Sequence, residues 1–447
     1  MNASLKKWKR GWIYALLLLL IGLIIYFWPY PEREKGMSRG EMRYHLGMVF
    51  LNQGERDKAM EVFQKAVELD PDSPMPYFGL GLVHTSHGKY DEAVEAFHKV
   101  IGLRPDFVEA YYNLGRVLAQ QGEYTEAIRA YEQVVAINPD LIQVYYNLGE
   151  IYMEGKEYAR AITEYKKAIQ RDPDYRDAHY ALGNAYSKQR KYSEAIQAYE
   201  RTLEIDSEHA KSHYGLGMAY MRQGKTDEGE RELEIFKQLY AYMEEIEQAE
   251  AVLRQSPNDP SVYVELGVIH ARYERFERAA RTFQRAIALD SVSVDAHHNL
   301  GLVYAQQGMY REAETAFQKA IGLDSVSVDA HHNLGLVYAQ QDKYREAETA
   351  FQKAIGLDAE FAPAYVELGA VHQQQGVLDK AMAEYQRAIA LDPHLLKAHN
   401  NLGVIYATQG RLQEAVAAWK AALAIDPTDP ETKRNLEEAE EIARKAP

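Results

Sequence analysis

The stretch of sequence that decides the fold occurs twice in succession. Residues 291–324 read SVSVDAHHNLGLVYAQQGMYREAETAFQKAIGLD, and residues 325–358 repeat them with only two substitutions. The Leu-Gly pair inside this stretch recurs along the chain at intervals of 34 residues, over 47–217 and again over 267–403. A fixed period of this size predicts a solenoid of repeated supersecondary units, which presents surfaces for binding.

The composition of each unit predicts two helices that pack closely. If residue 40 is position 1 of the first unit, position 8 is always Gly, position 20 is Ala or Gly, and position 24 is almost always aromatic. Small residues let two helices approach, and the aromatic ring fills the space beside them. Many units have Gly near position 15, where a left-handed conformation ends a helix. Pro follows several second helices, as at Pro71 and Pro173, and cannot continue them.

This pattern closely resembles the tetratricopeptide repeat over roughly residues 40–429. The resemblance implies an all-α, right-handed superhelical solenoid of about eleven helix-turn-helix repeats. We assign repeats 1–6 to residues 40–243, repeats 7–11 to 260–429, and a C-terminal capping helix to 430–447. Solenoids need such a cap because the last repeat would otherwise expose an apolar face.

An insertion divides the repeats, because one interval between successive glycines is 50 residues. Apolar residues continue a helical pattern through Asp227–Arg254, where Gly229 is the only Gly and Pro is absent. We therefore expect an extended second helix that includes the insertion at residues 244–259. The alternative is a break near Tyr240–Glu244 that yields an extra packed helix. Either arrangement interrupts the superhelix.

Composition excludes several classes of function. The net charge of −15 and the pI of about 5.5 disfavour nucleic-acid binding. The chain has no Cys, which excludes disulfides and thiolate metal sites. No phosphate-binding loop, dinucleotide fingerprint, zinc-protease motif or nucleophile elbow is present. We therefore predict no cofactor, no metal and no enzymatic activity of its own.

The N-terminal segment has a different character. Residues 11–30 contain no charged side chain and would span about 30 Å as a helix, which is the thickness of a bilayer core. Trp and Tyr lie near both ends, as in an interfacial belt. We predict a transmembrane anchor at 11–30, a cytoplasmic tail at 1–10 and a linker at 31–39. Basic residues before the anchor outnumber those after it by four to three, so the repeats are expected outside the cytoplasm.

Two alternatives to this topology stay open. A cleaved signal peptide would have a shorter apolar region followed by small residues, whereas this one ends in Phe27-Trp28-Pro29-Tyr30. The reverse orientation would place the repeats in the cytoplasm. The predicted localisation is a single-pass protein, with its repeats facing the periplasm from a bacterial inner membrane.

The resemblance also implies that positions 2, 5, 6, 9, 12 and 13 of each first helix face a concave groove. Position 6 is Asn in five repeats, and an amide can pair with an extended peptide backbone. Position 5 is aromatic in the first block and changes in the second. The candidate peptide-binding residues are Asn113, Asn147, Asn299, Asn333, Asn401, Tyr112, Tyr146, Tyr180, Tyr214, His298 and His332. Local bonding of Asn and packing of Tyr between helices are the alternatives.

Two further interpretations are disfavoured. His297-His298 and His331-His332 resemble metal ligands, but adjacent residues on a helix point apart and neighbouring repeats lie about a helix-packing distance apart. Groove-lining or packing His is therefore expected. The carboxylate clamp of chaperone-binding relatives has Lys at position 5 and Asn at position 9, and no repeat here has that pair.

The predicted function is a membrane-anchored scaffold that binds partner proteins or extended peptides, and the resemblance implies a place in a bacterial envelope assembly. One alternative is a self-associating organiser of a membrane complex, which would form homo-oligomers. Another is an accessory subunit that presents a substrate to a partner enzyme.

Overall fold

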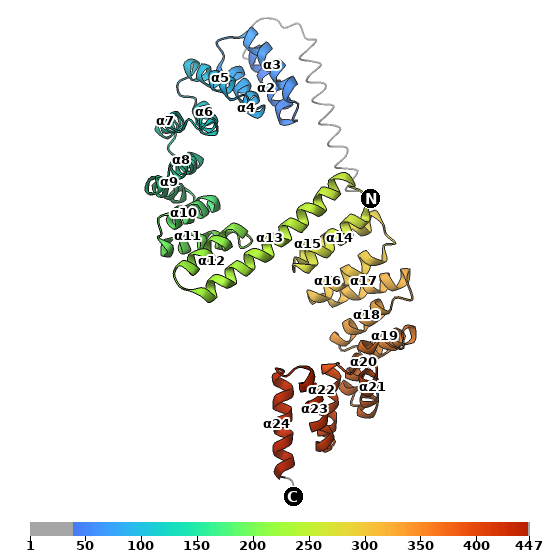
Figure 1. The fold of residues 1–447 in the computed structure, drawn as a ribbon. Helices are drawn as coiled ribbons and strands as arrows, with labels where there is room; N and C mark the ends of the chain where they lie inside the picture. Colours follow the sequence, from blue (N-terminus) through green and yellow to red (C-terminus); the bar gives the residue numbers. More distant parts are fainter. Residues whose placement is uncertain (1–38, 446–447) are drawn as a thin grey trace. The chain divides into compact units, whose positions relative to one another are not determined.

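The computed structural model describes residues 39–445, which form helices α2–α24 (Figure 1). The chain divides into two compact units, Met1–Leu233 and Glu234–Pro447. The helices that begin in the first unit are α2 Arg39–Asn52, α3 Arg56–Leu69, α4 Pro74–Ser86, α5 Tyr90–Leu103, α6 Val108–Gln121, α7 Tyr124–Ile137, α8 Ile142–Glu154, α9 Tyr158–Arg171, α10 Arg176–Lys188, α11 Tyr192–Ile205, α12 Ala210–Arg222 and α13 Thr226–Gln255. The second unit continues with α14 Pro260–Arg272, α15 Phe276–Leu289, α16 Val294–Gln306, α17 Tyr310–Leu323, α18 Val328–Gln340, α19 Tyr344–Leu357, α20 Ala362–Gln374, α21 Leu378–Leu391, α22 Leu396–Thr408, α23 Leu412–Ile425 and α24 Pro430–Lys445.

The two helices of each pair meet at the predicted small and aromatic positions. A Cβ built on Gly149 of α8 would lie 2.3 Å from the ring of Tyr165 on α9, and at the equivalent glycines of the other pairs the nearest atom would lie at 2.4–2.9 Å. The aromatic rings at position 24 are at most 3% exposed. Any side chain at position 8 would therefore push the two helices apart.

The turn between paired helices uses a left-handed residue at position 15 in every pair. Seven of these residues are Gly, as predicted, with φ between 70° and 83°. Lys156, Arg190, Glu274 and Asp342 adopt the same conformation with φ between 58° and 62°. The geometry of the turn is therefore set by the helix pair and is imposed on residues that do not favour it.

The first helix of each pair lies on the inner side of each unit. Within each unit, each even-numbered helix contacts the next even-numbered helix. Among the pairs from α3 to α11 and from α15 to α23, no two odd-numbered helices are in contact. The even-numbered helices of successive pairs therefore lie closer together than the odd-numbered ones. This difference in spacing curves the stack of helix pairs, with the even-numbered helices on the concave side. The even-numbered helices therefore form what is called here the inner surface of each unit.

Helix α13 is continuous over 30 residues and passes through Tyr240–Glu244 without a break (Figure 1). The structure thus has the extended helix that we expected, and not the additional short one. Its second half packs on α14 through a cluster that includes Tyr242, Ala249, Leu266 and Ile269.

The last helix covers the end of the second unit. Helix α24 contacts α22 and α23, and Ala439 is buried in the same cluster as Trp419. Over residues 430–442, the other side chains of α24 are mostly polar and exposed. It has the arrangement expected of a cap.

Within residues 39–445, no helix is both long and apolar enough to cross a membrane. The predicted anchor at 11–30 lies outside the described residues, as do the tail and most of the linker.

Candidate functional site

An open pocket lies on the inner surface of the first unit, where α8, α10 and α12 meet. Its volume is about 820 Å³. Most of the side chains around it occupy the groove positions of three successive repeats. They are Met153, Tyr180, Asn184, Ser187, Lys188, Arg190, Tyr192, Tyr199, Lys211, Tyr214, Gly215, Met218, Ala219 and Arg222. We call this the α8–α12 pocket. Tyr180 and Tyr214 are the predicted site residues that it brings together.

Three of the four predicted tyrosines at position 5 are only partly available, because each of these three packs on the aromatic ring at position 24 of its own repeat. The ring centroids of Tyr112, Tyr146 and Tyr180 lie 5.9–6.1 Å from those of Tyr131, Tyr165 and Tyr199. Tyr146 and Tyr180 also contact the next loop, through Tyr175 and His209.

Tyr214 differs from the other tyrosines at position 5. Position 24 of its repeat is Leu233 and not an aromatic residue, and Tyr214 is 48% exposed. It is the most exposed tyrosine of this set.

The asparagines at position 6 divide into two groups, according to whether position 24 of the preceding repeat is Tyr or Phe. The amide nitrogen of Asn147 donates to the hydroxyls of Tyr112 and Tyr131, both at 3.2 Å. That of Asn401 donates to the hydroxyl of Tyr385 at 3.1 Å. The side-chain amides of Asn147 and Asn401 therefore form hydrogen bonds within the protein.

The other three asparagines follow a Phe at position 24, which has no hydroxyl to accept a bond. Asn113 bonds within α6, to the Glu109 carbonyl and to Arg116. Asn333 interacts with the neighbouring His332. Asn299 forms no side-chain hydrogen bond within the part of the chain that the structure describes, and its side chain is partly exposed.

His298 and His332 replace Tyr at position 5 in the second unit and pack on phenylalanines. The ring of His298 lies 5.5 Å from that of Phe317, and His332 lies between Phe351 and Phe361. Burial lowers the pKa of both imidazoles, although nearby carboxylates partly oppose the effect. Both rings are therefore neutral at physiological pH.

In eight repeats, a ring at position 4 bonds to the preceding loop, and the sequence alone did not predict this contact. In eight repeats the Tyr hydroxyl or His Nε2 lies within 2.7–3.3 Å of the backbone carbonyl six residues earlier. The rings are Tyr145, His179, His213, Tyr263, His297, His331, Tyr365 and His399. His297 and His331 thus point away from His298 and His332. The signal was in the sequence, since position 4 alternates only between Tyr and His in these repeats.

The inner surface of the second unit is more apolar. Position 9 is aliphatic throughout, and position 12 is nearly always Ala. We call the following partly exposed residues the apolar stripe: Val268, Ala271, Leu302, Ala305, Leu336, Ala339, Ala370, Val404 and Ala407. In the first unit, position 9 includes Arg116, Glu150 and Asn184 instead.

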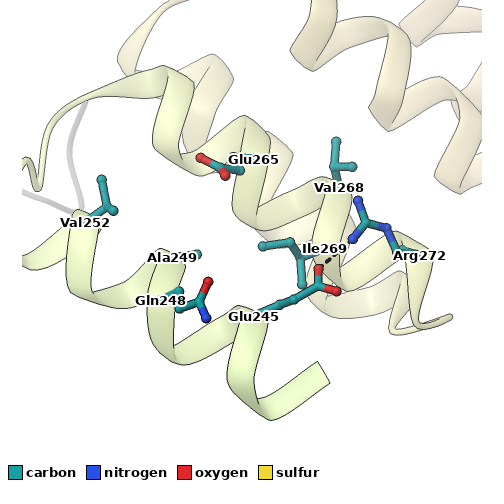
Figure 2. A pocket seen from close by; sticks show the side chains of 8 residues that line it. All are labelled: Glu245, Gln248, Ala249, Val252, Glu265, Val268, Ile269 and Arg272. Carbon is teal, nitrogen blue, oxygen red and sulfur yellow. Dashed lines mark hydrogen bonds and ion pairs between the residues drawn. The ribbon is translucent and has the colours of Figure 1, made fainter. Parts of the chain in front are cut away.

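The apolar stripe begins beside a smaller pocket between α14 and the second half of α13. Figure 2 shows this pocket, with Val252, Val268 and Ile269 on its walls. Its volume is about 570 Å³. Arg272 donates to Glu245 across one end at 2.6 Å, which closes that end with a neutralised ion pair.

The described residues contain no group of three or more His, Asp or Glu side chains that could hold a metal ion.

The repeats match known family models along most of their length. Models of the tetratricopeptide repeat match residues 78–142, 177–209, 210–234, 294–360 and 396–429, and a TPR repeat model matches 47–88, 149–190, 274–308 and 374–410. The chain is a tetratricopeptide repeat protein. No curated protein matched it.

Solved tetratricopeptide repeat structures resemble this protein in part. The MamA protein is 28% identical over 37% of this chain and 91% of its own, with a TM-score of 0.36. YrrB, described as a TPR protein with an unusual peptide-binding site, is 25% identical over 42% of this chain and 96% of its own, with a TM-score of 0.36. Yeast Tom70 is 16% identical over 91% of this chain and 96% of its own, with a TM-score of 0.39.

Proposed function

We propose that this tetratricopeptide repeat protein is a membrane-anchored scaffold, which holds partner proteins or extended segments of them on the inner surfaces of its two units. The observation that carries the proposal is the α8–α12 pocket, where side chains of three successive inner helices converge on one open cavity. Aromatic rings and side-chain donors together provide contact area and orientation for a peptide.

The anchor is part of this proposal and rests on the sequence of residues 1–39. An uncharged segment at 11–30 with basic residues before it supports an inner-membrane anchor, with the repeats in the periplasm. Alkaline phosphatase fused after Pro447 should be active in cells, and green fluorescent protein fused there should be dark. The opposite pair of results would place the repeats in the cytoplasm and refute this topology.

Partner capture from native membranes tests the scaffold itself. The full-length protein should be compared with a variant that combines Tyr214→Ala and Asn299→Ala, because both residues are at least partly exposed on the inner surfaces. A variant with Arg129→Glu and Lys166→Glu on the outer helices α7 and α9 is the control. We expect a partner, quantified by mass spectrometry, that is lost only from the first variant and that binds the purified full-length protein directly. Equal capture by all three folded proteins would show that neither Tyr214 nor Asn299 contributes to binding and would contradict their assignment as ligand contacts.

A further inference from the structure

The α8–α12 pocket has a charge opposite to that of the protein as a whole. Lys188, Arg190, Lys211 and Arg222 line it, whereas no Asp or Glu does. The chain has a net charge of −15. Like charges around one opening repel one another and create a local positive potential, which favours an anionic ligand.

These four cations have no counter-charge of their own among the described residues. Two arginines in the repeat that contains Lys188 and Arg190 are paired, since Arg176 pairs with Asp177 and Asp206, and Arg201 pairs with Asp174 and Glu204. Within residues 39–445, no ion pair joins Lys188, Arg190, Lys211 or Arg222 to a carboxylate. All four side chains are exposed. They are therefore available to neutralise carboxylates of a ligand.

The wall between the cations offers apolar surface and hydrogen-bond donors. Met153, Met218 and the half-exposed ring of Tyr214 provide the apolar part. Burial raises the pKa of Tyr199 to about 12, so its hydroxyl stays protonated and donates to Oδ1 of Asn184 at 2.8 Å. That bond turns the NH₂ group of Asn184 toward other acceptors.

We propose that the α8–α12 pocket binds an acidic segment of a partner protein, in which two or more carboxylates flank a large apolar side chain. The carboxylates pair with the four cations, and the apolar side chain lies against Tyr214 and the two methionines. This inference rests on the proposed function, since it names the chemistry of a partner on the inner surface of the first unit. The arrangement differs from the carboxylate clamp, because Tyr and not Lys occupies position 5.

A nucleic acid is also anionic, but the neighbouring inner helix disfavours it. The groove positions of α8 carry Glu150 and Glu154, and α10 begins with Asp177 in its first turn. A long polyanion that left the pocket along the inner surface would meet these carboxylates. A short acidic segment would not.

Fluorescence anisotropy with the purified full-length protein tests the inference. The probe is a labelled twelve-residue peptide in which Asp and Glu alternate with Leu and Phe. A neutral control peptide has Asn and Gln in place of the Asp and Glu. We expect the acidic peptide to bind at least about tenfold more tightly than the neutral one at low salt. Raising the ionic strength to about 1 M, where the Debye length falls to about 3 Å, should remove most of the difference.

Two matched charge-reversal variants locate the binding site. Lys188→Glu with Arg222→Glu should weaken the acidic peptide at least about tenfold, which is about 1.4 kcal/mol. Arg129→Glu with Lys166→Glu changes the net charge equally on outer helices and should leave the affinity unchanged. Circular dichroism confirms that both variants are folded.

Three results would overturn the inference. The acidic peptide could fail to bind at about 1 mM, or the two charge-reversal variants could bind it with equal affinity. The protein could also bind a twelve-residue oligothymidine more tightly than it binds the acidic peptide. If a captured partner depends on Tyr214 and Asn299 but is indifferent to Lys188 and Arg222, the scaffold function stands and the acidic ligand does not.

Discussion

Asn147 and Asn299 occupy the same position of the repeat but have different surroundings. Asn147 bonds to two tyrosine hydroxyls, whereas Asn299 follows Phe283 and has no such partner among the described residues. Replacing Asn147 with Ala should lower the free energy of unfolding by about 1 kcal/mol, because it leaves the hydroxyls of Tyr112 and of the buried Tyr131 without that bond. Chemical denaturation, with hydrogen exchange at α7 and α8, measures this.

Asn299→Ala is the control for that prediction, and its free energy of unfolding should stay within about 0.5 kcal/mol of the parent. If both variants lose the same stability, position 6 has a packing role in every repeat. That result would remove the reason for treating Asn299 as the asparagine of this set most available to a ligand.

The duplicated units provide a second comparison at single residues. Asp342 has φ 58° where its twin Gly308 has φ 72°. A non-Gly residue in this left-handed conformation costs about 1–2 kcal/mol, although Asp tolerates it better than most residues. The carboxylate of Asp342 also accepts a bond from the hydroxyl of Tyr344 at 2.7 Å. We therefore expect Asp342→Gly to stabilise the second unit by about 0.5–1 kcal/mol in thermal unfolding. A loss of stability would show that the bond to Tyr344 outweighs the strain.

The second substitution between the two copies of the duplicated repeat creates a contact between them. Lys343 donates to Glu314 of the preceding repeat at 2.8 Å. In the first copy, the residue at the equivalent position is Met309. A near-perfect duplication has thus been altered where one copy meets the other.

His298 and His332 predict a pH dependence of stability. Their folded pKa values lie below the usual value, which is about 6.5, so the unfolded chain binds more protons between the two values. Stability is full above about pH 6.5 and falls as the pH drops through that value toward the folded pKa. The melting temperature of the second unit should fall by a few degrees, on the order of 2–4 °C, between about pH 7 and 5.

A variant with His298→Tyr and His332→Tyr controls for the other titrating groups, because Tyr occupies this position in the first unit. Its melting curve should depend less on pH than that of the parent over the same range. Equal pH dependence would assign the effect to other residues.

At the scale of the element, the long helix was predictable because nothing in its sequence ends it. Residues 230–254 lack Gly and Pro, and apolar residues keep the helical spacing. The sequence still allowed a break at Tyr240–Glu244. The structure decides the matter, since α13 runs unbroken from Thr226 to Gln255. Its second half buries Tyr242 and Ala249 against α14.

Proline substitution tests that helix. Glu244 is exposed, so Glu244→Pro removes no core contact, but it should cost about 3 kcal/mol or more by breaking α13. Val294→Pro is the control, because Pro74 and Pro260 begin α4 and α14 at the same repeat position. Urea denaturation should show a large loss for the first variant and little change for the second. A tolerated Glu244→Pro would favour two separate helices.

The position-4 rings show what the sequence could not reveal at this scale. The repeat of Tyr and His was visible, but the carbonyl that each ring bonds lies in the preceding loop and depends on how two helix pairs stack. The left-handed turns at Lys156, Arg190 and Glu274 escaped prediction for a similar reason. Their residue types do not favour that conformation, and only the packing of the helix pair demands it.

At the scale of the whole molecule, the period of 34 predicted the repeated helix pairs but not the chemistry of their inner surfaces. That chemistry comes from residues of different repeats that converge in space, such as Lys188, Lys211 and Arg222. The periodic pattern says nothing about them, because they differ from one repeat to the next. The two units consequently present different surfaces: a basic, aromatic pocket in the first and an apolar stripe in the second.

The two surfaces should therefore select different ligands. Leu302 is the most exposed large residue of the apolar stripe, at 37%, and burying a leucine contributes about 1.5–3 kcal/mol. Leu302→Glu should weaken an apolar or amphipathic partner at least about tenfold and leave the acidic peptide unaffected. Val292→Glu, in the exposed loop before α16, adds the same charge outside the inner surface and is the control. Calorimetry of each captured partner against Leu302→Glu and the Lys188→Glu, Arg222→Glu variant measures the separation. If every partner responds to both changes, the units bind one continuous ligand; if each responds to one, the protein brings two different partners together, which a scaffold of two units is built to do.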